Sequence, residues 1–182
     1  MPIQPGIALP ALPATFAALQ AMRSIILSEC LVAGVTPFAA LTAADAARYG
    51  VANAVFAGRP KDFNDAYLPQ CCVWIPPESE AVAVTGSPGR VTAEFAARVQ
   101  AFVDPRGDWY AAEQQILAIR DSLWPALLRH ARLGGTVPTV LASEARPGRG
   151  LCFEQIAGSE YRCYDARWWV RQQWTLAAGR VV

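Results

Sequence analysis

Histidine and lysine are nearly missing from this sequence, and their scarcity restricts the chemistry that the chain can perform. Among its 182 residues there is one histidine, His130, and only one of the 16 basic residues is a lysine. A single histidine cannot supply both a Ser/His/Asp relay and the ligands of a metal site. His130 lies beside Arg129 and Arg132 at a predicted helix end, so we expect it to have a structural role.

The common catalytic motifs are missing as well. The chain has no Gly-x-x-x-x-Gly-Lys-Ser/Thr loop, no Gly-x-Ser-x-Gly elbow and no Gly-x-Gly-x-x-Gly turn. The loop carboxylates at Asp62, Asp65 and residues 78–80 do not have the spacing of a metal site. We therefore expect no catalytic residues, no bound cofactor and no metal, and we expect that the protein is not an enzyme.

The cysteines form no recognisable framework. There are 5 of them, an odd number, with no Cys-x-x-Cys pair and no zinc spacing. Cys71 and Cys72 are neighbours in a predicted strand, so their side chains point to opposite faces and cannot bind one ion together. We predict free, buried thiols in a reducing compartment for the whole set: Cys30, Cys71, Cys72, Cys152 and Cys163.

Long apolar runs and an excess of charge are also lacking. No run reaches the roughly 18 residues that a membrane-spanning helix needs, and the first residues lack the basic segment of a signal peptide. The net charge is +1, which gives no general attraction to nucleic acid or to anionic lipid. Residues 1–119 hold 7 basic and 10 acidic residues, whereas residues 120–182 hold 9 basic and 5 acidic residues. This uneven distribution is compatible with head-to-tail stacking of subunits and equally with random scatter.

What is present is enough apolar sequence to build one domain. The chain is 53% hydrophobic, so residues 15–182 are long enough to bury a core as a single α+β domain. Residues 1–14 contain four prolines, which predicts an extended arm rather than a helix.

The longest periodic segment is a helix predicted at 108–133. Asp108 is placed to cap its first turn, and Pro125 predicts a kink, or a break after which Ser122 caps the last turns. Apolar residues at steps of three or four predict a core-facing stripe of Trp109, Ala112, Ile116, Ile119, Leu123 and Leu127. A second strip lies either against the sheet and another helix or against another subunit, and contains Tyr110, Leu117, Trp124 and Leu128.

The remaining pattern predicts helices and strands in separate blocks. Helices are expected at 15–33 and, as one or two turns, at 43–49, with a long loop at 51–67. Strands are expected at 70–75, 81–85, 90–103, 137–142, 151–157 and 161–176, with a turn at 86–89 and a Pro/Gly/Arg loop at 146–150. This order predicts an α+β fold in which an antiparallel sheet of four to five strands has its helices packed on one face.

The last predicted strand has an unusual polar side. Trp169 lies there between Arg167 and Arg171, opposite the apolar side of the strand. Tryptophan and arginine are enriched in protein interfaces, so these residues are candidates for subunit contact, together with Trp124 and Tyr110 of the helix. Two other interpretations stay open: the chain's own N-terminal arm covers this face, or the face contacts single-stranded nucleic acid.

The order of elements resembles the tail terminator family of long-tailed bacteriophages, whose members are also called tail-to-head joining or tail completion proteins. The resemblance is carried by an N-terminal helix with an Ala/Gly/Pro-rich loop after it, and by Leu68-Pro69 before the strand at 71–75. It continues with the long strand at 91–103, the helix at 108–133 and a closing pair of strands.

The resemblance implies a structural protein of the phage neck. It implies a homohexameric ring that caps the tail tube protein, stops its polymerisation and docks to the head connector or stopper, assembled in the host cytoplasm and carried in the virion. DNA would pass through the ring without sequence specificity, and Arg146 and Arg149 are the candidates to face it. Two alternatives remain: another neck or tail component, such as a head-completion, stopper or tube protein, and a cytoplasmic bacterial α+β binding module.

Overall fold

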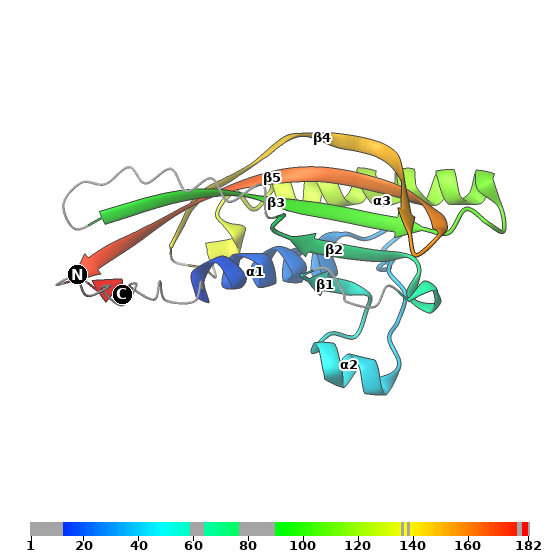
Figure 1. The fold of residues 1–182 in the computed structure, drawn as a ribbon, viewed down its shortest axis with the longest axis horizontal. Coiled ribbons are helices and arrows are strands. Elements are labelled where there is room, and N and C mark those ends of the chain that lie inside the picture. The colour runs from blue at the N-terminus through cyan, green and yellow to red at the C-terminus, as the bar shows by residue number, and fades with distance from the viewer. Residues whose placement is uncertain are drawn as a thin grey trace, which may run out of the picture.

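The computed structural model describes residues 13–58, 64–76, 90–135, 137, 139–177 and 180–181, and its architecture is α+β (Figure 1). The strand predicted at 81–85 and the turn at 86–89 lie outside these residues. So does the predicted N-terminal arm, except for its last two residues, which are helical.

One mixed sheet of six strands organises the described residues. Their order is β1-β2-β3-β5-β4 with β6 paired to β5; β1 runs parallel to β2 and every other pairing is antiparallel. The predicted α+β class is confirmed, and the predicted antiparallel sheet of four to five strands is right for every pairing except β1 with β2. The sequence missed β1 because its three residues are too few to show a periodic pattern. The strands are β1 Val55–Ala57, β2 Gln70–Trp74, β3 Arg90–Val103, β4 Val140–Ile156, β5 Ser159–Ala177 and β6 Arg180–Val181.

The helices divide between the two faces of the sheet. Helices α1 (Pro13–Glu29) and α3 (Trp109–Leu128) pack on one face, which we call the helix face. Helix α2 (Ala43–Tyr49) lies apart from them (Figure 1), and its last residue packs against a small apolar cluster on the opposite face, which we call the outer face. The sequence predicted helices on one face only, and the position of α2 does not agree with that prediction.

The main core fills the space between the helix face and the two long helices. Alternation along β3 sends every second residue into this core, as predicted, and α3 contributes its apolar stripe. Trp109 is the exception in that stripe: it is 54% exposed because it is the first residue of α3, at the edge of the sheet. The buried members from these two elements are Phe95, Ala97, Val99, Ala101, Val103, Ala112, Ile116, Ile119, Leu123, Ala126 and Leu127.

Helix α3 begins as predicted and ends earlier. The Asp108 carboxylate accepts a hydrogen bond from the Ala111 amide at 3.0 Å, which satisfies one free donor of the first turn. The helix passes through Pro125 without the predicted break and ends at Leu128, before the predicted end at residue 133. Ser122 donates to the Ile119 carbonyl of the same helix and does not start a new one.

Strands β4 and β5 form a long hairpin. The predicted loop at 146–150 is wrong, because β4 continues through this segment and only shifts its register on β5 between Arg146 and Gly150. Such a bulge absorbs extra residues without ending the strand. Gly148 allows the close approach, since a Cβ atom there would lie 2.6 Å from the Asp165 carbonyl oxygen.

Two smaller predictions are confirmed. Thr42 caps α2 by accepting a hydrogen bond from the Asp45 amide at 3.3 Å, as the sequence indicated. Cys71 and Cys72 enter different clusters on opposite faces of the sheet.

Among the described helices, none has both the length and the apolar character needed to span a bilayer.

Candidate interaction surface

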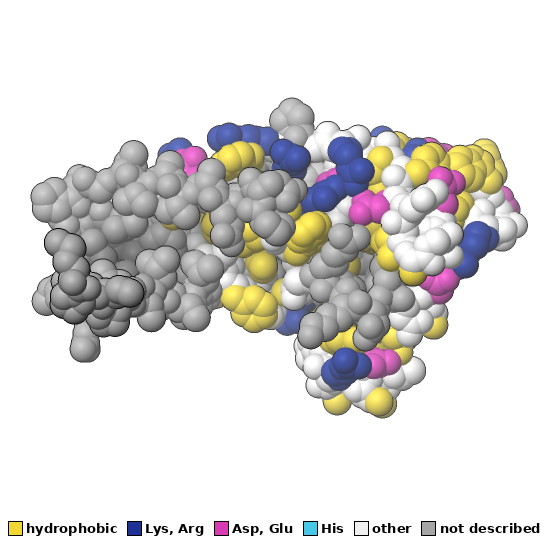
Figure 2. All heavy atoms as spheres, viewed as in Figure 1, with side chains coloured by type: hydrophobic (Ala, Val, Ile, Leu, Met, Phe, Trp, Pro, Cys, Tyr) yellow, Lys and Arg dark blue, Asp and Glu magenta, His cyan; other side chains and the backbone are white. Residues whose placement is uncertain are grey.

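The outer face carries most of the charged side chains of the sheet. Beyond the small cluster under α2, the register of β3, β4 and β5 places arginines, carboxylates and one tryptophan side by side. Figure 2 shows arginine side chains beside hydrophobic ones along the upper part of the visible surface. The charged residues and the tryptophan that β3, β4 and β5 place on the outer face include Glu94, Arg98, Glu144, Arg146, Arg149, Asp165, Arg167, Trp169 and Arg171.

A buried carboxylate lies at the centre of this face. Asp165 is 2% exposed, and its oxygens accept hydrogen bonds from Arg98 Nε at 3.0 and 3.1 Å and from Arg149 Nε at 3.0 Å. These hydrogen bonds are the main reason why the pKa values of Arg98 and Arg149 are raised, so both guanidinium groups stay charged. A buried charge is tolerable when it is compensated in this way.

Neutral side chains extend the same network across three strands. Gln100 is fully buried; its amide oxygen accepts from Trp74 Nε1 at 3.0 Å, and its amide nitrogen donates to Glu154 at 3.0 Å. Glu154 also accepts from Arg149 Nη2 at 2.6 Å, which joins this branch to the first. The hydrogen bonds link β2, β3, β4 and β5, so this part of the face is held in one arrangement.

An arginine–tryptophan strip, which we define as Arg146, Arg167, Trp169 and Arg171, lies next to this network. The Arg146 guanidinium carbon is 4.3 Å from the centre of the Trp169 ring, a cation–π distance. Arg171 donates to Glu94 at 2.6 Å, whereas Arg167 is exposed and makes no ion pair with any residue that the structure describes.

The structure brings together three interface candidates and places the two DNA-channel candidates in a strand. Arg167, Trp169 and Arg171 lie on one face, as predicted. Arg146 and Arg149 do not project from a loop, because both belong to β4, where Arg146 covers Trp169 and Arg149 holds Asp165. Strict alternation would have placed these two arginines, three residues apart, on opposite faces, and the Pro-Gly pair between them indicated a loop. The bulge in β4 brings both to the outer face.

A second exposed surface lies where α3 begins. We call Trp109, Tyr110 and Phe153 the aromatic end cluster. Tyr110 is 71% exposed, and the rings of Trp109 and Phe153 stack with centroids 5.1 Å apart. Arg162 lies 4.7 Å from the Phe153 ring and donates to Glu113 at 2.6 Å, which ties the hairpin to α3. Phe153 was missed by sequence reasoning because only the fold brings it to Trp109.

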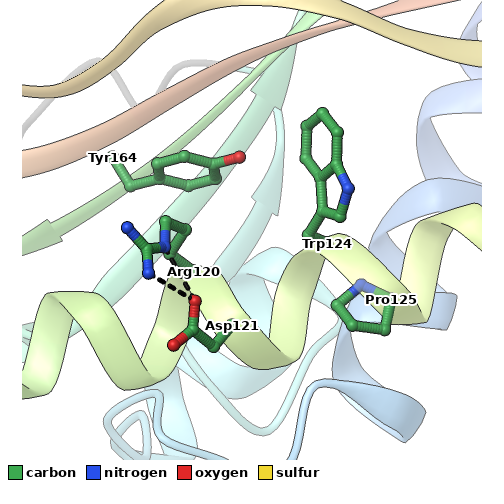
Figure 3. Close-up of a pocket in the computed structure, with 5 residues that line it drawn as sticks. All are labelled: Arg120, Asp121, Trp124, Pro125 and Tyr164. Atoms are coloured by element: carbon green, nitrogen blue, oxygen red, sulfur yellow. Dashed lines mark hydrogen bonds and ion pairs between the residues drawn. The ribbon is translucent and has the colours of Figure 1, made fainter.

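Trp124, another interface candidate, lines a groove between α3 and β5 instead of joining Tyr110. Figure 3 shows it with its neighbours, and the groove has a volume of about 480 Å³. Trp124 packs against buried Trp168 with ring centroids 5.5 Å apart. Burial is the main reason why the pKa of Tyr164 is raised to about 12. The other residues that line the groove are Arg120, Asp121 and Pro125.

The side chain of His130 contacts Glu29, which belongs to none of these surfaces. Its ring nitrogen contacts the Glu29 carboxylate, and Arg129 lies 3.0 Å from the same carboxylate. The hydrogen bond with His130 is the main reason why the pKa of Glu29 is lowered. Within the described ranges, no three His, Cys, Asp or Glu side chains are arranged to hold a metal ion.

Comparison of the sequence with family models and curated proteins finds no relative. No protein-family model matches the chain, and no curated protein sequence matches it. The class of protein is therefore defined by the fold itself: an α+β protein built on a mixed sheet, with an arginine–tryptophan strip on one side and an aromatic end cluster on the other.

Proposed function

We propose that this protein is a non-enzymatic structural subunit of a long-tailed phage neck, which forms a ring that ends the tail tube and joins it to the head connector. The arginine–tryptophan strip carries this proposal. Tryptophan and arginine dominate the energetic centres of protein interfaces, and the strip has both on a sheet face that is stiffened by buried hydrogen bonds.

A rigid strip suits binding because little conformational entropy is lost on contact. Trp169 lies under the Arg146 guanidinium, and Arg146 is in turn bonded to Glu144 at 2.7 Å, so the ring has one preferred orientation. Side chains that are already fixed in the free protein do not have to be ordered by the partner. Arg167 offers a charge that the described residues leave available for a carboxylate of a neighbour.

Ring formation needs two different patches that meet head to tail. The aromatic end cluster is the candidate for the second patch. Phe153 pairs with Arg162 in the hairpin register. Arg162 is seven residues from Trp169 along β5, so the two patches are about 20 Å apart along the strand. Phe153 also points to the opposite side of the sheet from Cys152 and the outer face, so the two patches face different neighbours.

Weak contact with DNA fits the same proposal. Arg146 and Arg149 share their charge with Glu144 and with Asp165 and Glu154, so neither presents a bare cation to the solvent. Partly neutralised arginines attract phosphates weakly, and salt screens that attraction. A channel through which DNA must move needs contacts of this kind rather than tight ones.

A cytoplasmic binding module is the second candidate, and the groove at Trp124 favours it. A groove of about 480 Å³ with two aromatic rings and an Arg120–Asp121 pair has the size and the mixed lining of a small-molecule site. It is the weaker candidate because an open groove buries little of a ligand. Another neck component would use the same surfaces as a terminator. Tail length in the phage therefore distinguishes a terminator from another neck component.

Assembly in solution is the direct test. We expect the wild-type protein to give closed rings, with hexamers predominant, in negative-stain images and mass photometry. Trp169→Ala, and Arg167→Glu combined with Arg171→Glu, should weaken association by about 2 kcal/mol or more, roughly 30-fold. Arg132→Glu is the matched control, because it changes an exposed arginine outside both patches.

Folding must be measured on the same variants. If the strip is an interface, the melting temperatures of the strip variants stay close to that of wild type while the rings are lost. A collapse of the melting temperature with intact rings would instead show that Trp169 is part of the subunit's own core. A wild-type protein that stays monomeric at high concentration, alone and with tail tubes, would contradict the ring.

A further inference from the structure

Two cysteines face each other across the long hairpin. Cys152 of β4 and Cys163 of β5 are directly opposed in the antiparallel register, and both point to the outer face. Their sulfur atoms are 2.7 Å apart, and both thiols are free. The sequence alone did not pair them, because they are eleven positions apart in the chain with a turn between them.

The backbone already has the geometry that a disulfide needs. Directly opposed residues of antiparallel strands have Cβ atoms about 4.5–5.5 Å apart, near the range of about 3.5–4.5 Å that a disulfide requires. The two sulfurs need to move together by less than about 1 Å to reach a bond length of about 2.05 Å. The other cysteines are placed differently: Cys30 contacts Ser122, and Cys71 and Cys72 lie on opposite faces of the sheet.

The two thiols differ in their access to solvent. Cys152 is half-buried, whereas Cys163 is fully buried between Phe102 and Cys152. Burial is the main reason why the pKa of Cys163 is raised, so this thiol is the less reactive of the two. A reagent from solution therefore meets Cys152 first.

We propose that Cys152 and Cys163 are a modification site, at which an oxidised low-molecular-weight thiol such as glutathione disulfide forms an intramolecular disulfide. The Cys152 thiolate attacks one sulfur of the reagent, which forms a mixed disulfide and releases one thiol. Cys163 then loses its proton and attacks the Cys152 sulfur, which releases the second thiol. The two protein thiols lose two electrons and two protons, and the reagent disulfide gains them.

The disulfide would brace the end of the hairpin. It closes the loop of residues 153–162, whose two end residues, Phe153 and Arg162, are paired in the register. Phe153 belongs to the aromatic end cluster, and Arg162 contacts the Phe153 ring. Closing a loop restricts the unfolded chain more than the folded one, so the oxidised form is the more stable. The proposal rests on the hairpin geometry alone and does not depend on the function proposed above.

The test uses the full-length protein, kept reduced or incubated with glutathione disulfide. We expect denatured oxidised protein to show two fewer free thiols than the 5 in the sequence, an intact mass lower by two hydrogen atoms, and a 152–163 cross-link on peptide mapping. The melting temperature should rise by about 5 °C on oxidation and return on reduction.

Variants separate this bond from other oxidation products. Cys152→Ser and Cys163→Ser should each abolish the mass loss and the thermal shift, and Cys30→Ala should keep both. Four results overturn the proposal: five unchanged thiols in wild type, glutathione retained on Cys152, a cross-link that maps to another pair, and a disulfide between two chains on a non-reducing gel. Because the cross-link is mapped in the wild-type protein, the proposal can be overturned even if a serine variant misfolds.

Discussion

Asp165 is the residue on which the arrangement of the outer face depends. Its buried carboxylate is the shared acceptor of Arg98 and Arg149, so removing its charge leaves Arg98 without its carboxylate and leaves Arg149 with Glu154 alone. Removing one member of a buried ion pair costs more than the pair contributes, because the remaining charge stays desolvated. The consequence is measurable in a single substitution.

We predict that Asp165→Asn lowers the free energy of unfolding by about 3 kcal/mol, measured by urea denaturation. The matched control is Glu144→Gln, which removes an exposed carboxylate paired with Arg146 and should change stability by less than about 1 kcal/mol. Equal effects of the two changes would show that the buried network does not stabilise the fold.

Tyr164 gives a pH dependence whose sign follows from its burial. Its pKa in the folded protein is raised to about 12, whereas an unfolded tyrosine ionises near pH ~10. A group with a raised folded pKa contributes stability that is complete below the unfolded pKa and is lost as pH rises through the folded pKa. We therefore predict that stability falls between about pH 10 and pH 12.

The substitution Tyr164→Phe isolates this effect. The variant should keep wild-type stability near neutral pH within about 1 kcal/mol and should lose less of it between about pH 10 and pH 12. Urea midpoints measured across this range, together with the ultraviolet absorbance of tyrosinate, provide the check. Identical alkaline slopes for both proteins would mean that Tyr164 ionises as freely in the folded state as in the unfolded state.

At the scale of elements, the bulge in β4 decides where two arginines lie. The register shift between Arg146 and Gly150 lets β4 pass through a Pro-Gly pair and still present Arg146 to Trp169 and Arg149 to Asp165. The passage is possible because residue 148 has no side chain, so the backbone of β5 can approach it closely.

We predict that Gly148→Ala destabilises the protein by about 2 kcal/mol, since its Cβ would lie 2.6 Å from the Asp165 carbonyl oxygen and 2.9 Å from the Ala166 Cα. Gly107→Ala is the control, because nothing lies within 4 Å of a Cβ at that position. Thermal unfolding of both variants makes the comparison. Equal stability of the two variants would place the bulge further from β5 than the register implies.

At the scale of the whole molecule, the proposed terminator role predicts a phenotype of assembly and not of chemistry. Deleting the gene from its phage should leave DNA-filled heads together with tails of abnormal length or tails that are not attached, as counted by electron microscopy. His130→Ala and chelating agents should leave infectivity unchanged, because the His130 ring contacts Glu29 and none of the candidate interface residues among the described residues.

Two results would contradict this role. Tails of normal length that are joined to heads in the deletion mutant would exclude a terminator. Loss of heads from otherwise normal tails would instead favour another neck component. A metal present in stoichiometric amount in the purified protein would reopen the question of an enzyme.

The sequence by itself determined the elements whose pattern is local. Alternation along residues 90–103 predicted β3 and its buried side, steps of three and four predicted α3 and its core stripe, and Asp108 and Thr42 predicted two helix caps. These features depend on the geometry of one strand or one helix turn, so neighbouring residues carry enough information to find them. The placement of Arg167, Trp169 and Arg171 on one face followed for the same reason.

Only the tertiary structure decided which distant elements meet. It paired the three-residue β1 in parallel with β2, carried β4 through its bulge, brought Phe153 to Trp109, and placed Cys152 against Cys163. It also turned Arg146 and Arg149 from expected loop residues into parts of two separate contacts. Each of these outcomes depends on packing and hydrogen bonding between segments far apart in the chain. The local periodicity of the sequence does not predict such contacts.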